Sequence, residues 1–111
     1  MYWYMETWKI KPAWEALSPE ERQEFMAKLK PLVDSLMTDE CELVGCIVTD
    51  DDTHLHGGFQ YGAVWRATDR SHITKIEEGT AAIGWNDYFE QVNHGSRLVS
   101  ADEVMQHMFH A

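Results

Sequence analysis

Two histidines separated by one residue lie in a stretch with the composition of a metal-binding loop. Residues 50–58 read DDDTHLHGG, so three carboxylates precede His54 and His56 and two glycines follow them. Imidazole nitrogens and carboxylate oxygens are common ligands of divalent metals. The same residue types also make a solvated turn between two strands. We therefore expect either a metal site at His54 and His56 or a flexible loop.

A second group of potential ligands lies near residue 110. Glu103, His107 and His110 recur at steps of four and three, which places them on one face of a helix. They could hold a metal ion with their nitrogen and oxygen atoms. Alternatively, they form the polar side of an amphipathic helix that docks on another surface.

His72 is the histidine best placed for catalysis. It lies four residues before Ile76 and eleven before Ile83, on the predicted sheet-facing side of a helix. Imidazole titrates near neutral pH, so His72 is a candidate general base or ligand of haem iron. The alternative is a histidine at the edge of the core whose ring is satisfied by a hydrogen bond.

Large aromatic residues accompany His72 in the sequence. Tyr61, Trp65 and Trp85 could form the wall of an apolar pocket for a flat aromatic substrate. Thr7 and Tyr88 would then supply polar groups that orient the ligand. Aromatic side chains on strands also serve as plain packing, and both interpretations can hold together.

Length and composition indicate one domain over residues 1–111. The chain has 111 residues, 44% of them hydrophobic, and halves of it would be too small to bury a core. No stretch reaches the roughly 20 apolar residues of a membrane span, and the first residues carry charges where a signal peptide would be apolar. We expect a cytoplasmic protein. Its two cysteines are too few for a disulfide framework.

The charge excludes some partners. The net charge is −10, with 19 acidic and 9 basic residues. The long-range field therefore repels nucleic acid and anionic membrane surfaces. Five tryptophans in so short a chain point instead to a pocket or a subunit interface.

Capping signals and periodicity predict the elements that position these residues. SPEE at 18–21 and SADE at 100–103 are capping boxes, and Asp69 is a helix N-cap. Pro31 is expected to kink or divide the first helix. The run at 42–49 is apolar enough for a strand buried on both faces. The predicted order is a strand over 1–10, a helix over 18–36, strands over 42–49 and 59–67, a helix over 69–84, a strand over 88–94 and a helix from 100.

This order is βαββαβ followed by a short C-terminal helix. It predicts an α+β, ferredoxin-like fold with a four-stranded antiparallel sheet and two helices on one face. The other face is expected to carry Tyr2, Tyr4 and Trp8. Because such an apolar face would be exposed in a monomer, we predict a homodimer that buries it.

The segment VWRATDRSHITKIEEGTAAIGWNDYFEQVN, residues 64–93, resembles the dimeric α+β barrel superfamily, which includes antibiotic-biosynthesis and haem-degrading monooxygenases. Within it, GWNDYFEQVN also resembles a family of small uncharacterised bacterial proteins. Length and element order match over about the whole chain. The resemblance bears on fold more than on activity.

The haem-degrading branch implies an Asn in the first strand, a Trp near the end of the third strand and a His on the second helix. Trp65 matches the Trp position, Thr7 stands at the Asn position, and His72 lies nearer the Trp than the pattern places its histidine. By this resemblance Thr7, Trp65 and His72 are the candidate catalytic residues. The cofactor is then haem, or there is none.

We therefore expect a cavity between sheet and helices that binds a small apolar or aromatic molecule. Its expected lining residues are Thr7, Tyr61, Trp65, His72, Trp85 and Tyr88. The leading hypothesis is a monooxygenase-like enzyme, with His72 as base or ligand. The alternatives are a non-catalytic or stress-associated homodimer that binds a small ligand, and a metal-binding protein that uses the histidines.

Overall fold

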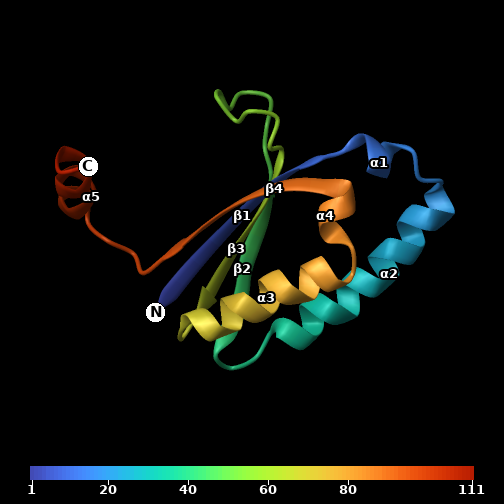
Figure 1. Cartoon of the computed structure of the whole chain (residues 1–111), viewed down its shortest axis with the longest axis horizontal. Coiled ribbons are helices and arrows are strands. Elements are labelled where there is room, and N and C mark those ends of the chain that lie inside the picture. The colour runs from blue at the N-terminus through green and yellow to red at the C-terminus, as the bar shows by residue number, and fades with distance from the viewer.

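The computed structural model describes residues 1–111 (Figure 1). Its elements, in chain order, are β1 (Tyr2–Ile10), α1 (Pro12–Glu15), α2 (Pro19–Leu36), β2 (Cys41–Val48), β3 (Tyr61–Ala67), α3 (Arg70–Ala82), α4 (Trp85–Tyr88), β4 (Phe89–Ser96) and α5 (Ala101–Phe109). The predicted order of strands and long helices is confirmed. The one-turn helices α1 and α4 were not predicted.

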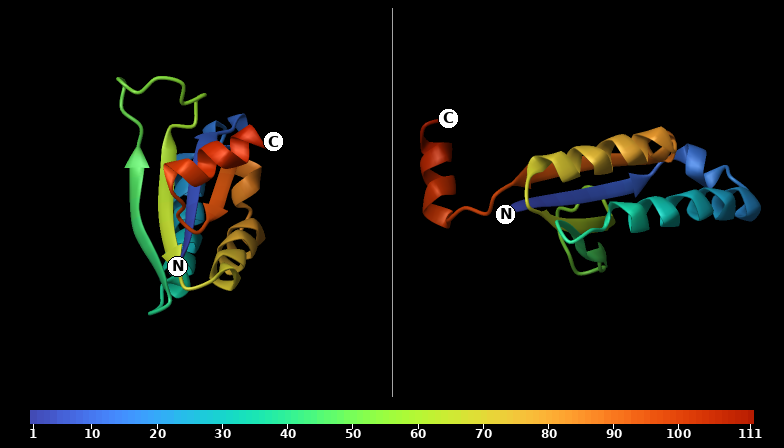
Figure 2. Two further views of the ribbon diagram at one scale, coloured as in Figure 1. Left: turned by 90° about the vertical axis from the view of Figure 1, so that its left-hand side faces the viewer. Right: turned by 90° about the horizontal axis from the view of Figure 1, so that it is seen from below.

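The four strands form one antiparallel sheet in the order β2-β3-β1-β4. Helices α2 and α3 lie side by side on one face of this sheet, and no element covers the other face (Figures 1 and 2). This arrangement is the predicted ferredoxin-like α+β fold, with α5 as its C-terminal helix. We call the face under α2 and α3 the inner face and the opposite one the open face.

Local signals fix the helix ends. The Ser18 hydroxyl accepts a hydrogen bond from the Glu21 backbone N–H, and the Glu21 carboxylate accepts one from the Ser18 N–H. Asp69 caps α3 through the Ser71 N–H. After α3, Gly84 has a φ of 88°, a left-handed conformation that glycine adopts without steric cost. Helix α2 continues through Pro31 to Leu36, so the predicted division of this helix does not occur.

Strand β1 faces the helices with the side that we predicted to be open, and its other side is exposed. Tyr4 and Glu6 are buried on the inner face, whereas Met5 is exposed on the open face. Strand alternation puts Trp8 with Tyr4 and Thr7 with Met5. The prediction that Tyr2, Tyr4 and Trp8 face a second copy is therefore wrong. This side of the strand can be buried because Trp65 and Gln91 donate hydrogen bonds to the Glu6 carboxylate. The sequence alone does not reveal these partners.

Strand β2 is an edge strand and is mostly exposed. Cys41 is buried and Leu43 half-buried, but Val44, Ile47 and Val48 are exposed. The prediction of a strand buried on both faces is wrong, because β2 lies at the margin of the sheet. A bulge between Leu43 and Gly45 also shifts its register against β3.

The inner face holds two hydrophobic clusters. One surrounds Ile73 and Ile76 of α3 and includes Tyr4 and Trp65 from the sheet. The other is aromatic and lies where α1, α2 and α4 meet the sheet; its buried members are Trp14, Phe25, Trp85 and Phe89. Trp8 packs against both clusters and so joins them.

None of the helices has the length and apolar character that crossing a membrane requires.

Candidate functional site

A carboxylate lies buried at the junction of the two clusters. Glu6, in the middle of β1, is only 7% exposed. Its Oε1 accepts a hydrogen bond from Trp65 Nε1 at 2.7 Å, and its Oε2 accepts one from Gln91 Nε2 at 2.8 Å. Burial raises the pKa of the Glu6 carboxyl, and these two hydrogen bonds lower it in part. The net shift is upward, which favours the protonated form.

Gln91 connects this carboxylate to the aromatic cluster. Its Oε1 accepts a hydrogen bond from Trp85 Nε1 at 2.7 Å, while its Nε2 donates to Glu6 and to Asn93 Oδ1 at 2.6 Å. Gln91 and Asn93 project from the same side of β4, because they are two residues apart. A chain of hydrogen bonds therefore runs from Trp85 through Gln91 to Glu6 and on to Trp65.

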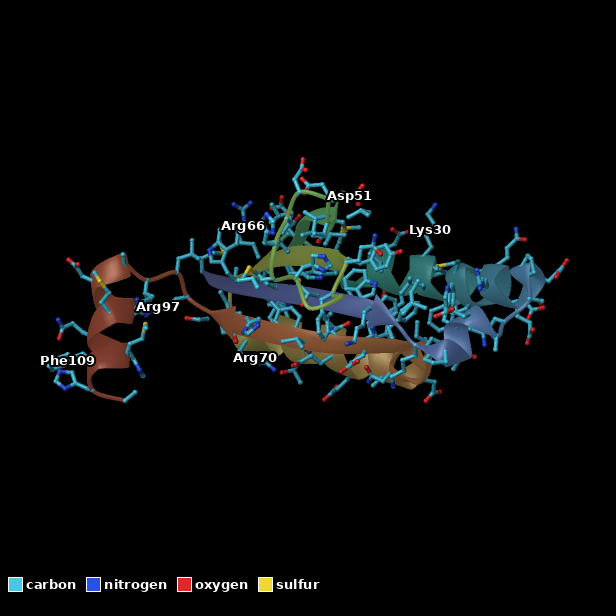
Figure 3. All side chains as sticks on the ribbon, turned by 90° about the horizontal axis from the view of Figure 1, so that it is seen from above. Lys30, Asp51, Arg66, Arg70, Arg97 and Phe109 are labelled. Atoms are coloured by element: carbon cyan, nitrogen blue, oxygen red, sulfur yellow. The ribbon has the colours of Figure 1, made fainter.

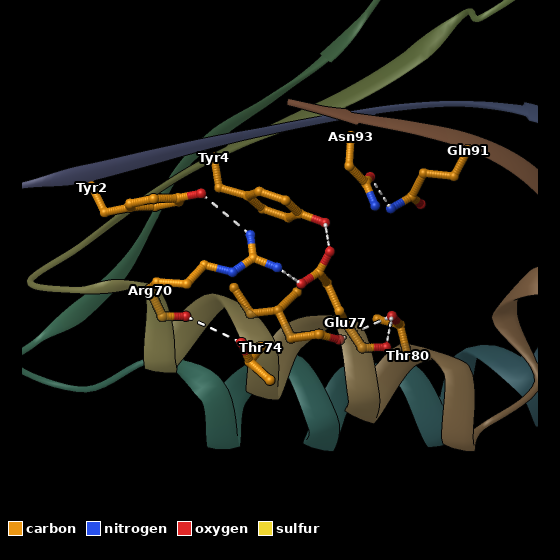
Figure 4. A network of polar contacts seen from close by, with 9 residues as sticks. Tyr2, Tyr4, Arg70, Thr74, Glu77, Thr80, Gln91 and Asn93 are labelled. Atoms are coloured by element: carbon orange, nitrogen blue, oxygen red, sulfur yellow. Dashed lines mark hydrogen bonds and ion pairs between the residues drawn. The ribbon is translucent and has the colours of Figure 1, made fainter. Parts of the chain in front are cut away.

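A second polar group joins the tyrosines of β1 to Arg70 and Glu77 of α3 (Figure 4). The Tyr4 hydroxyl donates to Glu77 Oε2 at 3.4 Å, and Arg70 forms an ion pair with Glu77. Arg70 Nη1 also donates to the Tyr2 hydroxyl at 3.3 Å. Burial is the largest cause that raises the pKa of the Tyr4 phenol, followed by the charge of Glu6, so this tyrosine stays neutral. The charge of Glu77 further raises the pKa of Glu6.

An apolar cavity of about 310 Å³ lies on the other side of Trp85. All of its lining residues are hydrophobic: Trp8, Ile10, Trp14, Met26, Leu29, Tyr61, Trp85 and Phe89. Trp8 and Trp85 meet edge to face with ring centroids 5.2 Å apart, and Trp8 stacks on Tyr61 at 6.2 Å. The cavity has the dimensions and walls of a site for a small apolar or aromatic molecule.

This arrangement combines an apolar binding space with a carboxylate of raised pKa. The Trp85 ring lines the cavity, and its Nε1 reaches Gln91, which holds Glu6. A carboxylate withdrawn from water is a stronger base than one on the surface, and it ionises nearer to neutral pH. We call Glu6, Gln91, Trp85 and the cavity the inner site.

The structure does not bring the three predicted catalytic residues together. Trp65 is 3% exposed in the core beside Glu6. Thr7 lies on the open face, with its backbone paired to Gly62 and Val92. His72 lies at the start of α3, where its Nε2 is 3.3 Å from Glu40 Oε2. The sheet separates Thr7 from the other two.

The surroundings of His72 do not fit a haem group. The hollow beside it is lined by polar and charged side chains and one leucine: Ser35, Leu36, Thr38, Asp39, Glu40, His72 and Lys75. A haem macrocycle requires apolar walls and a free axial nitrogen. Glu40 already occupies the Nε2 side of the His72 ring. We therefore derive no chemistry through haem.

The predicted ligand-binding aromatics lie together around the second cluster. Tyr61 and Trp85 line the cavity. Tyr88 packs behind it, with its ring 5.7 Å from Trp14 and 5.2 Å from Phe25. The expected grouping of these rings is thus present, although Tyr88 is not among the lining residues.

The histidine-rich segments do not assemble ligand clusters. His54 and His56 are exposed in the loop between β2 and β3, where His56 Nδ1 accepts a hydrogen bond from the Gly58 N–H at 3.1 Å. Asp50 accepts hydrogen bonds from Thr53. On α5, Glu103 pairs with Arg97 at 3.0 Å. Nowhere do three His, Cys, Asp or Glu side chains converge as a metal site requires.

Sequence reasoning missed Glu6 and Gln91. Glu6 shares its side of the first strand with Tyr2, Tyr4 and Trp8, and a single carboxylate within an aromatic row is the signal that could have singled it out. A buried carboxylate with partners from distant strands marks a candidate functional position. Gln91 carried no signal, since its role depends on the pairing of β4 with β1.

Comparison with known proteins identifies a family. The chain belongs to DUF6616, a family of unknown function whose model matches residues 1–111. No curated protein matches the chain.

Two solved structures resemble the chain. One is the solution structure of a hypothetical Arabidopsis thaliana protein, At3g17210, with 12% identity and a TM-score of 0.52, covering 90% of this chain and 89% of that one. The other is a dimeric ferredoxin-like protein of unknown function from Thermobifida fusca, with 12% identity and a TM-score of 0.50, covering 87% and 90%. At such identity these likenesses show the ferredoxin-like fold.

Proposed function

We propose that this member of DUF6616 is a small-molecule enzyme of the monooxygenase-like type, in which the aromatic cavity binds an apolar or aromatic substrate and Glu6 is the base. The observation that carries the proposal is the buried Glu6 carboxylate, joined to the cavity wall through Gln91 and Trp85. We assign the role of base to Glu6 instead of His72, because His72 is paired with Glu40 at the margin of the fold.

The energetics of Glu6 support a role in proton transfer. Withdrawing an ionised carboxylate from water costs several kcal/mol, and hydrogen bonds offset this cost only in part. Trp65 and Gln91 stabilise the ionised form, whereas burial and Glu77 favour the protonated one. A carboxylate whose pKa is raised by burial is a stronger base than one on the surface, which suits it to accept a proton from a substrate.

The substrate approaches Glu6 through the position of the Gln91 side chain. Gln91 is half-buried and lies between Trp85 and Glu6. Neither Glu6 nor Gln91 lines the cavity, so a ligand meets the Glu6 carboxylate only when the Trp85 ring and the Gln91 amide both move aside. The aromatic rings give the cavity apolar walls, so few water molecules compete with the Glu6 carboxylate for the bound substrate.

The proposed chemistry begins with removal of a proton from an acidic C–H group of the substrate. The C–H electron pair stays on carbon and the proton passes to Glu6. With dioxygen as co-reactant, a CH₂ group becomes a carbonyl: one oxygen atom enters the product, and the other leaves as water with the two hydrogens. Donors such as Trp85 Nε1 are suited to stabilise the intermediate anion.

The same proposal includes a homodimer. The Thermobifida fusca protein of similar fold is described as dimeric. Here the open face carries exposed Met5, Ile47 and Val92, which a second copy would cover. Its residues differ from those expected from the sequence, but the sheet is again the contact surface.

The test uses 2-tetralone, an apolar aromatic ketone with an acidic C–H group, and separates binding from base catalysis. Binding is followed by tryptophan fluorescence, and exchange of the C1 hydrogens with D₂O by NMR. Wild type is compared with Glu6→Gln and with His72→Gln as the matched control. We expect all three proteins to bind, wild type and His72→Gln to accelerate exchange, and Glu6→Gln to lose the acceleration.

A non-catalytic ligand-binding dimer is the second candidate. It is favoured by one observation: both Glu6 oxygens already have hydrogen-bond partners. Binding without accelerated exchange would support it and reject the enzyme. Equal exchange by wild type and Glu6→Gln would reject Glu6 as the base, and absence of binding would reject both candidates.

A further inference from the structure

A single copy of this chain exposes more surface than a compact monomer of its size. A monomeric protein of 12.9 kDa exposes about 6,300 Å². This chain exposes 7791 Å², an excess of about 1,500 Å². Its radius of gyration is 15.9 Å, against about 13 Å for a compact domain of this length. The excess indicates surface that another molecule covers.

Part of this excess lies on α5. The helix stands apart from the rest of the fold, on the side of the open face, as Figures 1 and 2 show. Its apolar residues are all exposed: Val104, Met105, Met108 and Phe109, with Phe109 80% exposed. In Figure 3, Phe109 lies at the far end of the molecule. Ser100 nevertheless caps the helix by accepting a hydrogen bond from the Glu103 N–H. A capped helix with an unpartnered apolar side is built for docking.

The open face of the sheet is a second apolar surface that no element of the chain covers. Met5 is 50% exposed and Ile47 57%, and Val44 and Val92 are also exposed. Four strands of about eight residues make a face of roughly 19 by 26 Å, or about 500 Å² in projection. The apolar side of α5 adds about 130 Å². Because side chains roughen both surfaces, their accessible area approaches the roughly 800 Å² that each partner contributes to a standard interface.

We propose that α5 is exchanged between two copies: the open faces of the copies pack together, and α5 of each docks against β2 of the other. The inference rests on the homodimer of the proposed function. It adds that the exchange of α5 stabilises this dimer. Open faces in contact bring the partner's sheet to the side on which α5 projects (Figure 2). Such a contact is isologous: both copies contribute the same surfaces, so the contact between α5 and β2 occurs twice in the dimer.

Strand β2 fits α5 better than β4 does. The residues of β2 toward the open face include exposed Val44 and Ile47. On β4 the corresponding residues are Glu90, Val92 and His94, and the two polar side chains on either side of Val92 match an apolar helix less well. Both β2 and β4 are edge strands, so the preference for β2 rests on these side chains alone.

The first test measures the mass of the particle in solution by size-exclusion chromatography with light scattering. The full chain is compared with the double variant Met105→Ser/Met108→Ser and with Gln106→Ser as the matched control. Since α5 stands apart from the core, circular dichroism should show all three folded alike. We expect dimers for wild type and control, and a dimer weakened by roughly tenfold or more in the double variant, through lost apolar burial. An equally tight dimer in the variant would overturn the exchange.

The second test asks whether α5 of one copy lies close to β2 of the other. Cys46 of β2 is exposed and Cys41 buried, so a nitroxide label attaches at Cys46 alone. Cys46 pairs with the buried Ala63, so its side chain points away from the open face. Labelled copies are mixed with unlabelled copies that carry ¹³C-methyl methionine.

We expect the label on one copy to broaden the Met105 and Met108 signals of the other. A dimer without this broadening would overturn the exchange and leave the homodimer intact. A monomeric wild-type protein would overturn the exchange and the homodimer together, whereas the inner site of Glu6 would still be judged by the tetralone assay.

Discussion

The inner and open faces of the sheet differ in whether the side chains on them find partners within the same chain. On the inner face, even a carboxylate has partners within the chain, since Glu6 meets Trp65 and Gln91. On the open face, Met5 and Ile47 have no covering element. The polar network is thus complete in one copy, whereas the apolar surface is not. The comparison teaches that one copy completes the polar network of the inner face by itself, whereas its open face lacks a covering element.

The largest difference between the two faces is expected in the free energy of unfolding, when an isoleucine on each face is changed to alanine. Ile76→Ala, in the core at 1% exposure, should lower the free energy of unfolding by about 2–5 kcal/mol, because it leaves a cavity. Ile47→Ala, the matched change on the open face, should cost less than about 0.5 kcal/mol in dilute protein. Urea unfolding measures both. Equal losses would erase the distinction between the faces.

The next effect concerns the hydrogen bonds of Glu6. Trp65→Phe keeps the aromatic ring but removes the Nε1 donor from the buried carboxylate, which should cost about 1.5–3 kcal/mol at neutral pH. The loss should shrink in acid, where the Glu6 carboxyl is protonated. Urea unfolding at two pH values tests this. A loss that does not change with pH would show that the donor does not act on a charged group.

A pH-dependent effect should follow from Glu6 itself. Because burial raises the pKa of Glu6 in the folded chain, the folded state holds the proton more tightly than the unfolded state, whose carboxyl titrates near about 4.3. Stability should therefore fall as the pH rises from there through the raised pKa, by at most about 1.4 kcal/mol per pH unit. Glu6→Gln should lack this fall. A wild-type-minus-variant difference that is flat with pH contradicts it.

The smallest effect is expected at His72. Its pair with Glu40 includes a carboxylate that is 66% exposed, so His72→Gln should change the free energy of unfolding by less than about 1 kcal/mol. Binding of an aromatic ligand should not change, because His72 does not line the aromatic cavity. A loss of binding measured by fluorescence would return His72 to the site.

The elements of the fold could be predicted because their signals are local. The capping box at Ser18, the cap at Asp69 and the left-handed Gly84 each act within a few residues. Alternation in β1 also sorted its residues into two sides correctly. It could not say which side faces the helices, because that choice depends on partners for Glu6 that lie far along the chain.

The site was predicted less well for the same reason. Tyr61 and Trp85 were placed at the cavity because aromatic residues on strands and helices gather in the core. His72 was favoured because the spacing to Ile76 puts both on one side of a helix, but its position in the first turn carries it to the margin beside Glu40. Gln91 acquires its role only through strand pairing.

The most direct test of the account is an NMR titration of the Glu6 side-chain carboxyl carbon, assigned by its absence in Glu6→Gln, with and without 2-tetralone. We expect the pKa of Glu6 to lie above the ordinary glutamate range and to change further when the ligand is bound. An ordinary pKa that the ligand does not alter would contradict the account, because Glu6 would then be neither desolvated nor in communication with the cavity.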